Sequence, residues 1–395
     1  MIYFLVKFPV SSSIYTNSPL LPMKKFTALS AVVALALVAC QFPGNTEETI
    51  KIGLITPLTG EIASIGNDVL HGTQIKLKEI NDAGGIDGRL IELVVEDGRC
   101  TGADAASAAQ KLVNVDQVVA IHGAGCSGES LAAAPIVEAA QIVMISPSSS
   151  SPDVTDAGDF VFRTYPNDAL KTAAMAQYFK DQGFTKVAVI SENTDFCVGF
   201  RDSLKKDMGD SAELIFDEMV APETKDYRAL MARLTEVEFD VFVANAQTPP
   251  TGSVMLQQLR EQGMEQLVIS QDVMDSTVVI ELAGEASEGL QVINVPTISE
   301  ESEFGQKFVA EYGAPESNMA WAGYGYDTLG VLAQTIAEVG TDGPAMRDYL
   351  YGMDKYAGVV GNISFDENGD VVGVKYALRE VKDGAFVKIS DIEVN

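Results

Sequence analysis

Short β-branched runs alternate with helical patterns along most of this chain, and that alternation limits the folds open to it. The run TIKIGLITPL at 49–58 predicts a buried strand, and GNDVLHGTQIKLKEINDAGG predicts a helix that ends at Gly84-Gly85. Further strands are expected at 89–98, 117–124 and 141–146, and helices at 103–115 and 130–140. Such regular alternation predicts a parallel sheet with helices on both faces.

A second series of the same kind follows FVFRTY at 160–165. Helices are expected at 168–183, 197–208, 227–237 and 253–263, and strands at 186–192, 212–220, 239–246 and 266–271. Mostly helical patterns come next, at 303–312, 320–338 and 344–352, and Asn368-Gly369 then predicts a hairpin-like turn. The sequence therefore predicts an α/β protein with two doubly wound parallel-sheet lobes.

Charge excludes two classes of partner. The chain has 395 residues and a formal net charge of -29. A nucleic-acid partner requires stripes of Lys and Arg, which this sequence lacks. An anionic membrane surface would repel such a chain. We therefore expect no nucleic-acid partner, and no membrane contact through surface charge.

The N-terminal region has the pattern of an export signal. Met23-Lys24-Lys25 precedes FTALSAVVALALVA, an apolar stretch of signal-peptide length that is too short to span a bilayer. The stretch ends in Leu37-Val38-Ala39-Cys40, which resembles a bacterial lipobox, a signal in which the cysteine becomes the lipidated N-terminus. Residues 1–40 are thus a signal region, with Met23 rather than Met1 expected as the start, and 41–48 form a polar tether.

Cysteine count and compartment suggest a single bridge. Export permits disulfides. With Cys40 lipidated, Cys100, Cys126 and Cys197 remain, and this odd number predicts one disulfide and one free thiol.

The segment from Gly123 to Gly128, GAGCSG, matches G-x-G-x-x-G between an expected strand and an expected helix. However, the next strand ends in Ser146, where a dinucleotide site requires an acidic residue. We expect no nucleotide cofactor. The turn still presents backbone N–H groups and the positive end of a helix dipole to an anion.

The sequence contains too few histidines for most histidine-based sites. His71 and His122 are the only histidines in the sequence, and no G-x-S-x-G segment is present. A metal site or a catalytic triad built on histidine is therefore disfavoured. We expect His122 to be structural, and we expect no metal, no cofactor and no enzymatic activity.

Four serines between two prolines, ISPSSSSP at 145–152, invite two interpretations, an interdomain linker or a binding loop. Ser151-Pro152-Asp153 has the pattern of a helix start, with a capping serine, Pro at the first position and an acid in the first turn. Ser148, Ser149 and Ser150 then follow the carboxyl end of a parallel strand, which is the edge where open α/β sheets bind ligands. A binding loop is favoured over a linker.

Several segments together resemble the Leu/Ile/Val-binding protein family, the type I solute-binding proteins of ABC transporters. They are IKIGLITPLTGEIASIG, INDAGGIDGRLIELVVEDGRC, HGAGCSGES, VMISPSSSSPDVT, EYGAPESNMAWAGYGYDTLGVLAQTIA and SFDENGDVVG. The resemblance implies two lobes that close over a ligand about a hinge of three crossovers, near Arg163-Thr164, Pro296 and Val372. Lobe 1 would comprise 49–163 and 295–372, and lobe 2 would comprise 164–294 and 373–395.

The resemblance also implies a ligand site. A ligand α-carboxylate would be held by Ser127 and by the loop Ser148, Ser149 and Ser150, because a buried carboxylate needs such donors. An α-ammonium would meet Asp272, one methylene shorter than the usual Glu of the family; a loop or capping acid is the other interpretation of this residue. The implied disulfide joins Cys100 to Cys126 and leaves Cys197 as the free thiol.

Three positions depart from the family pattern and leave the ligand side chain open. Ile65 stands at an aromatic position of the first glycine loop, and Phe196 replaces a tyrosine that covers the ligand. A further tyrosine is missing in the ANAQTPP loop, near Gln247 or Thr248.

The resemblance implies a substrate-binding lipoprotein of an ABC importer, anchored in the cell envelope on the periplasmic side. It would capture a small amino acid, branched-chain or otherwise apolar, and deliver it to permease and ATPase subunits. An amine-free acid or amide, such as an aromatic carboxylate, is the alternative ligand. A secreted α/β enzyme is the third hypothesis.

Overall fold

A parallel sheet of five strands organises the first part of the fold. The computed structural model describes residues 49–222 and 224–392. The sheet has the order β2-β1-β3-β4-β5, and all its neighbouring strands pair in parallel. Its strands are β1 (Ile50–Thr56), β2 (Ile91–Asp97), β3 (Ala120–His122), β4 (Val143–Ser146) and β5 (Val161–Arg163). We call this sheet and the helices packed on it lobe 1.

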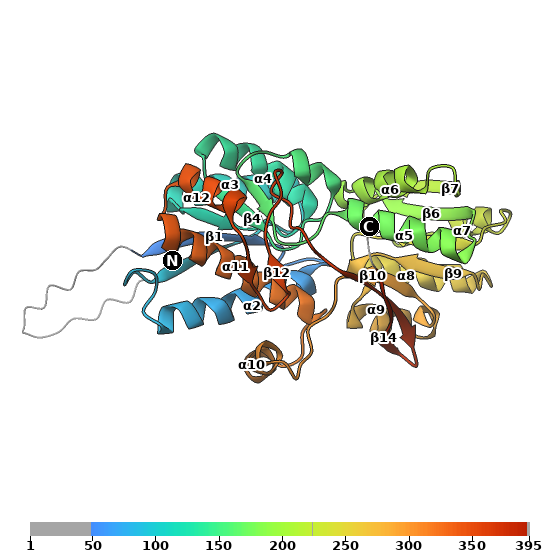
Figure 1. Ribbon diagram of the computed structural model, residues 1–395. Coiled ribbons are helices and arrows are strands. Elements are labelled where there is room, and N and C mark those ends of the chain that lie inside the picture. The colour runs from blue at the N-terminus through green and yellow to red at the C-terminus, as the bar shows by residue number, and fades with distance from the viewer. Residues whose placement is uncertain (1–48, 223, 393–395) are drawn as a thin grey trace, which may run out of the picture. The chain divides into compact units, whose positions relative to one another are not determined.

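Helices cover both faces of this sheet (Figure 1). One face carries α3 (Gly102–Lys111) and α4 (Ser127–Ala140), and the other carries α2 (Ala63–Asp82), α11 (Met319–Val339) and α12 (Gly343–Gly352). Successive strand residues point to opposite faces, so Ala120 packs with the α11 side and Ile121 with the α3–α4 side. Burial on both faces explains why the strands are apolar runs rather than alternating ones.

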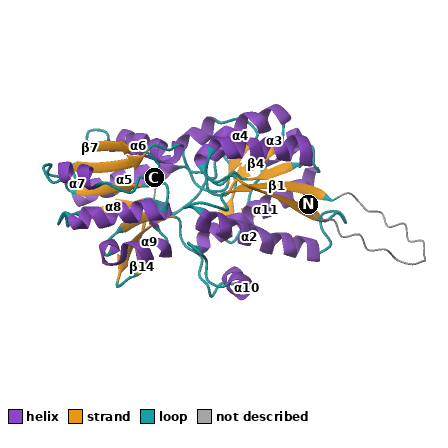
Figure 2. Ribbon diagram, turned by 180° about the vertical axis from the view of Figure 1, so that it is seen from behind, coloured by secondary structure: helices purple, strands orange, loops and turns teal. Residues whose placement is uncertain are grey.

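A second sheet of seven strands forms the centre of what we call lobe 2. Its order is β14-β13-β10-β9-β8-β6-β7. The parallel strands are β6 (Lys186–Glu192), β7 (Glu213–Val220), β8 (Val241–Asn245), β9 (Leu267–Ser270) and β10 (Gln291–Asn294). The helices are α5 (Asp168–Gln182), α6 (Asp195–Met208), α7 (Arg228–Leu234), α8 (Pro249–Glu261) and α9 (Thr277–Ala283), and Figure 2 shows α5 and α6 across the sheet from α8 and α9.

The predicted α/β fold with two doubly wound lobes is confirmed, and lobe 2 adds one feature to it. Strands β13 (Tyr376–Lys382) and β14 (Ala385–Ile392) extend the sheet antiparallel to β10. Their hairpin turns at Asp383-Gly384, where both residues have positive φ, as a tight turn between antiparallel strands requires. The sheet is therefore mixed at this edge.

The chain passes between the two sheets after β5, after β10 and before β13. Between the second and third passages it forms α10 (Glu303–Tyr312), α11, α12 and the short strands β11 (Tyr356–Ala357) and β12 (Asn362–Ile363). Within the described residues, no helix combines the length and hydropathy that a membrane span requires.

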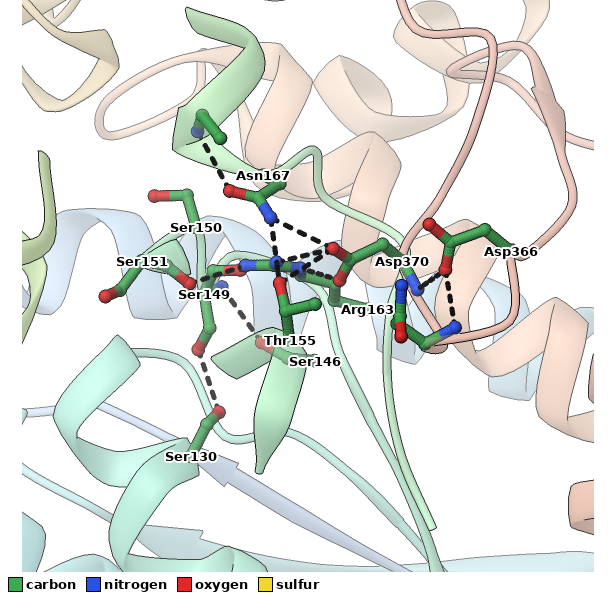
Figure 3. Close-up of polar contacts among 12 residues, drawn as sticks. Ser130, Ser146, Ser149, Ser150, Ser151, Thr155, Arg163, Asn167, Asp366 and Asp370 are labelled. Atoms are coloured by element: carbon green, nitrogen blue, oxygen red, sulfur yellow. Dashed lines mark hydrogen bonds and ion pairs between the residues drawn. The ribbon is translucent and has the colours of Figure 1, made fainter. Parts of the chain in front are cut away.

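A buried guanidinium joins two of these passages (Figure 3). Arg163, at the end of β5, is 1% exposed. Its Nε donates to Asp370 Oδ1 at 2.5 Å, and Nη2 donates to Asp370 Oδ2 at 2.9 Å. Its Nη1 also donates to the Ser151 carbonyl at 2.8 Å. Burial favours the protonated form of Asp370, but its bonds with Arg163 outweigh burial and hold the pKa of this carboxyl below its usual range.

Replacing Arg163 should destabilise the protein strongly. In Arg163→Met the Asp370 carboxylate stays buried without its cation, so we expect the free energy of unfolding at neutral pH to fall by about 3–5 kcal/mol. Because the pKa of Asp370 is lowered in the folded state, its contribution is present at neutral pH and disappears as the pH falls through that lowered value. Urea unfolding followed by circular dichroism at several pH values measures both effects.

Arg228→Met is the matched control, because Arg228 pairs with Asp226 and Glu261 while 57% of its side chain is exposed. This substitution should lower the free energy of unfolding by less than about 1 kcal/mol. Equal losses in the two variants would contradict the importance of the buried pair.

Candidate ligand-binding site

The N-terminus of α4 forms one end of a pocket. Strand β3 ends at His122, and the glycine-rich turn leads to Cys126, the capping residue of α4. Gly125, Cys126 and Ser127 all line the pocket. The first N–H groups of a helix have no partner within the helix, and the helix dipole adds partial positive charge there. This end of the pocket is suited to an anion.

Glu129 holds the turn in place from behind. Its carboxylate is buried and accepts the backbone N–H groups of Cys126 at 2.8 Å and Cys100 at 2.7 Å. Burial raises the pKa of Glu129 to about 7, although these backbone hydrogen bonds lower it. The disulfide joins the same two cysteines, with their Cα atoms 5.4 Å apart. The predicted Cys100–Cys126 bridge is therefore present, and Cys197 is a buried free thiol.

The serine run lies inside lobe 1, between β4 and β5 of one sheet, so the interpretation as an interdomain linker is wrong. Ser151 caps the following 3₁₀ helix, as predicted, by accepting the N–H of Asp153. Ser127 Oγ accepts the N–H groups of Ser150 at 3.3 Å and Ser151 at 3.1 Å. The loop is thereby tied to the first turn of α4.

The serines of this loop differ in position. Ser148 lines the pocket, and its hydroxyl donates to the Gly125 carbonyl at 2.6 Å. Ser149 and Ser150 are not among the lining residues of this pocket. The Ser149 hydroxyl bonds to Ser130 Oγ at 2.8 Å, and the Ser150 hydroxyl donates to Asp168 Oδ2 at 2.9 Å. Both belong to the layer that supports the pocket wall.

The two lobes together enclose this pocket. Six of the predicted residues line it: Ile65, Ser127 and Ser148 from lobe 1, and Phe196, Gln247 and Asp272 from lobe 2. The lining also includes residues that sequence reasoning missed, namely Thr56, Pro57, Ile62, Val273 and Trp321. The apolar side chains among them, Ile62, Ile65, Phe196, Val273 and Trp321, form the part of the wall that an apolar ligand group could contact.

Asp272 is paired within the protein. Its Oδ2 accepts Lys171 Nζ at 2.6 Å and Tyr165 Oη at 2.6 Å, and its Oδ1 accepts the N–H of Val273 at 2.9 Å. Lys171 also forms an ion pair with Asp168 at 2.7 Å. Burial opposes the charged form of Lys171, but the two carboxylates hold its pKa above the usual value. Burial raises the pKa of Asp168, against the charge of Lys171.

The sequence contains a pattern that could have identified Lys171 as a residue of the site. On α5, Asp168, Lys171, Met175 and Phe179 fall on one helix face, and all four are buried. A lysine on an otherwise buried stripe needs a carboxylate partner, because an unpaired buried charge is costly. Trp321 offered no such signal, since α11 is apolar along most of its length.

Side chains of the two lobes also meet at residues that do not line the pocket. Glu61 of lobe 1 forms an ion pair with Lys225 of lobe 2 and accepts the hydroxyl of Thr248 at 3.2 Å. On another side, Asn318 Nδ2 donates to the Asp275 carbonyl at 3.2 Å, and Ser317 Oγ bonds to Ser276 Oγ at 3.1 Å. The structure thus brings the lobes into direct contact.

The described residues contain no group of three or more His, Cys, Asp and Glu side chains placed to hold a metal ion. His122 is fully buried beside Thr73, and burial lowers its pKa to about 3. The imidazole is therefore neutral and offers no positive charge to an anion.

Comparison with known proteins agrees with this geometry. A model of the family described as periplasmic binding protein matches residues 49–385. The chain belongs to that family. Periplasmic binding proteins of this fold are non-enzymatic, so the sequence-based identification and the expectation of a binding protein rather than an enzyme are confirmed.

Individual relatives are similar over nearly their whole length. The chain is 25% identical over 366 residues to a leucine-, isoleucine-, valine-, threonine- and alanine-binding protein of Pseudomonas aeruginosa, covering 91% of this chain and 97% of the relative. A leucine-binding protein of Thermotoga maritima has a TM-score of 0.81 and 28% identity, covering 87% of this chain and 99% of that one. A branched-chain amino acid transporter substrate-binding protein of Streptococcus pneumoniae, in complex with isoleucine, has a TM-score of 0.77 and 25% identity, covering 87% and 100%.

The buried thiol should be unreactive in the native periplasmic binding protein. Cys197 is fully buried, and burial raises the pKa of its thiol well above the usual value, so little thiolate can meet a reagent. We expect iodoacetamide to modify Cys197 more than about a hundredfold faster in guanidinium chloride than in native buffer, because access requires an opening that costs several kcal/mol. Peptide mass mapping without reductant measures this and should find Cys100 joined to Cys126; rapid native labelling of Cys197 would contradict the structure.

Proposed function

We propose that this periplasmic binding protein is the extracytoplasmic capture component of an ABC importer for a small apolar carboxylic acid. One observation carries the proposal: the N-terminus of α4 opens into an interlobe pocket whose remaining wall is largely apolar. The ligand carboxylate would accept N–H groups at this helix end and the hydroxyl of Ser127, and the Ser148 hydroxyl would join them by turning from the Gly125 carbonyl to the ligand. The protein would bind the acid unchanged.

Closure of the lobes would complete the site. Residues from both lobes line the pocket, and three chain passages connect the sheets, which is the arrangement of a hinge. The acid would bind lobe 1 through the α4 end, and lobe 2 would then cover it with Phe196 and Asp272. The Glu61–Lys225 pair would help to hold the closed form, although an exposed pair of this kind contributes at most about 1 kcal/mol.

A small apolar amino acid is the first candidate ligand. The relatives in Thermotoga maritima and Streptococcus pneumoniae are, by name, a leucine-binding protein and a branched-chain amino acid binding protein. Asp272 lies in the pocket wall and is the residue expected to meet an α-ammonium.

An amine-free acid is the second candidate, and one contact favours it. The Asp272 carboxylate already has an ammonium partner in Lys171. An acid without an amine would therefore not face an uncompensated carboxylate.

Delivery and location complete the proposal. The closed, loaded protein would dock on permease subunits driven by an ATPase. A lipid at Cys40 would hold it in the cell envelope on the periplasmic side, with 41–48 as a tether. Met23, Cys40 and the signal region lie outside the described residues.

A ligand screen tests the proposed capture of an acid. A ligand that binds only the folded state stabilises it by about 2.7 kcal/mol at a hundredfold excess over Kd. We expect the melting temperature of the mature protein to rise by several degrees with at least one small apolar carboxylic acid in a panel of amino acids, amides, and aliphatic and aromatic acids. Differential scanning fluorimetry measures the shift; a response to amides alone, or to no acid, would refute the proposal.

The anchor has its own test. Cys40→Ser removes the lipid acceptor, so the expressed protein should move from the membrane fraction to the supernatant. Cys197→Ser is the matched control and should stay with membranes, because Cys197 is buried in lobe 2. Mass spectrometry of the N-terminal peptide should find a diacylglyceryl-modified Cys40; an unmodified cysteine there would contradict the proposal.

A further inference from the structure

Three charged side chains form a buried row behind the lobe 2 wall of the pocket. Lys171 Nζ lies between the two carboxylates, 2.7 Å from Asp168 Oδ1 and 2.6 Å from Asp272 Oδ2. Asp168 and Lys171 are fully buried, and Asp272 is 1% exposed. Of the three, only Asp272 lines the pocket. An ammonium of the protein therefore occupies the position behind the acid that was expected to receive an ammonium of the ligand.

The hydrogen-bonding capacity of Asp272 is largely used. A carboxylate offers about four acceptor sites. Lys171 and Tyr165 fill two on Oδ2, and the N–H of Val273 fills one on Oδ1. Desolvating this carboxylate is thus already compensated by a cation and two neutral donors, without any contribution from a ligand.

We infer that Lys171 takes the place of a ligand amine, and that the acid captured in this pocket carries no cationic amino group. The inference rests on the proposed function and narrows it to an amine-free apolar monocarboxylate. A second ammonium beside Asp272 would lie close to that of buried Lys171, and like charges repel strongly where protein rather than water surrounds them. An amine-free acid avoids that repulsion and leaves the row of charges intact.

The other groups near the row add no unpaired charge. The Ser150 hydroxyl donates to Asp168, and burial raises the pKa of Asp168 while the charge of Lys171 lowers it. Asp275, the next acid along the chain, is paired with Arg379, whose Nη1 lies 2.5 Å from Asp275 Oδ2. Tyr165, Tyr324 and Tyr376 stay neutral, because burial raises the pKa of each.

The wild-type protein gives the decisive comparison. L-leucine and 4-methylpentanoate share a carboxylate and a branched chain and differ by the amino group, and benzoate supplies an aromatic acid. Isothermal titration calorimetry with the mature protein should find 4-methylpentanoate or benzoate bound at least tenfold more tightly than L-leucine. A tighter complex with L-leucine would overturn the inference and leave the proposed capture of an acid standing. Binding of none of the three would overturn the inference, and the proposed capture of an acid would also fall if no acid of the wider panel binds.

A variant tests whether Lys171 causes the preference. Lys171→Met removes the internal ammonium and keeps an unbranched apolar chain of similar length. The two carboxylates then lack a cation, so the affinity for an amine-bearing ligand should rise. We expect the ratio of the Kd for L-leucine to the Kd for 4-methylpentanoate to fall at least tenfold.

Lys180→Met is the matched control, because Lys180 lies on the same helix and is exposed. For this control, the ratio of the Kd for L-leucine to the Kd for 4-methylpentanoate should equal that of the wild type. A folded Lys171→Met protein with an unchanged ratio would overturn the inference. Should that variant fail to fold, the wild-type comparison alone decides.

Discussion

The guanidinium of Arg163 connects the ligand pocket to the passages between the lobes. It lies at the last residue of β5, directly before the chain leaves lobe 1, and it bonds to Asp370, shortly before the chain returns to lobe 2. Because the guanidinium is buried, it cannot donate to water, so its N–H groups donate to the Ser151 carbonyl, Thr155 and Asp370. The shape of the serine loop and the start of two passages therefore depend on one cation (Figure 3).

The serine loop contacts the pocket through fewer hydroxyl groups than its composition suggests. Only Ser148 of the three central serines lines the pocket, while Ser149 and Ser150 connect the loop to α4 and to Asp168. Through Ser150, the anion end of the pocket is linked to Lys171 and Asp272 at the lobe 2 wall. A run of hydroxyls here mostly builds a rigid support, and the α4 backbone supplies much of the charge complementarity.

The fold was accessible from the sequence because β-branched runs and helical periods alternate, and parallel strands buried on both faces are continuous apolar runs. The edge strands β13 and β14 were harder, since β14 is mostly exposed and lacks such a run. The serine loop and the glycine-rich turn were reachable from their positions after strands, whereas Ser127 and Asp272 were reached through the family resemblance. Trp321 and Lys171 were not, because their proximity to the pocket comes from helices that are distant in sequence. Only the packing of α11 and α5 brings them there.

The pocket lining runs from Thr56 in the first strand region to Trp321 in α11. No short segment of the chain contains it, and neither lobe alone can enclose a solute. The site therefore exists only after the chain has been made at least as far as Trp321 and both lobes have formed. A bound solute can stabilise the folded protein but cannot direct the early steps of folding. The nascent chain must therefore reach its native topology through its own contacts.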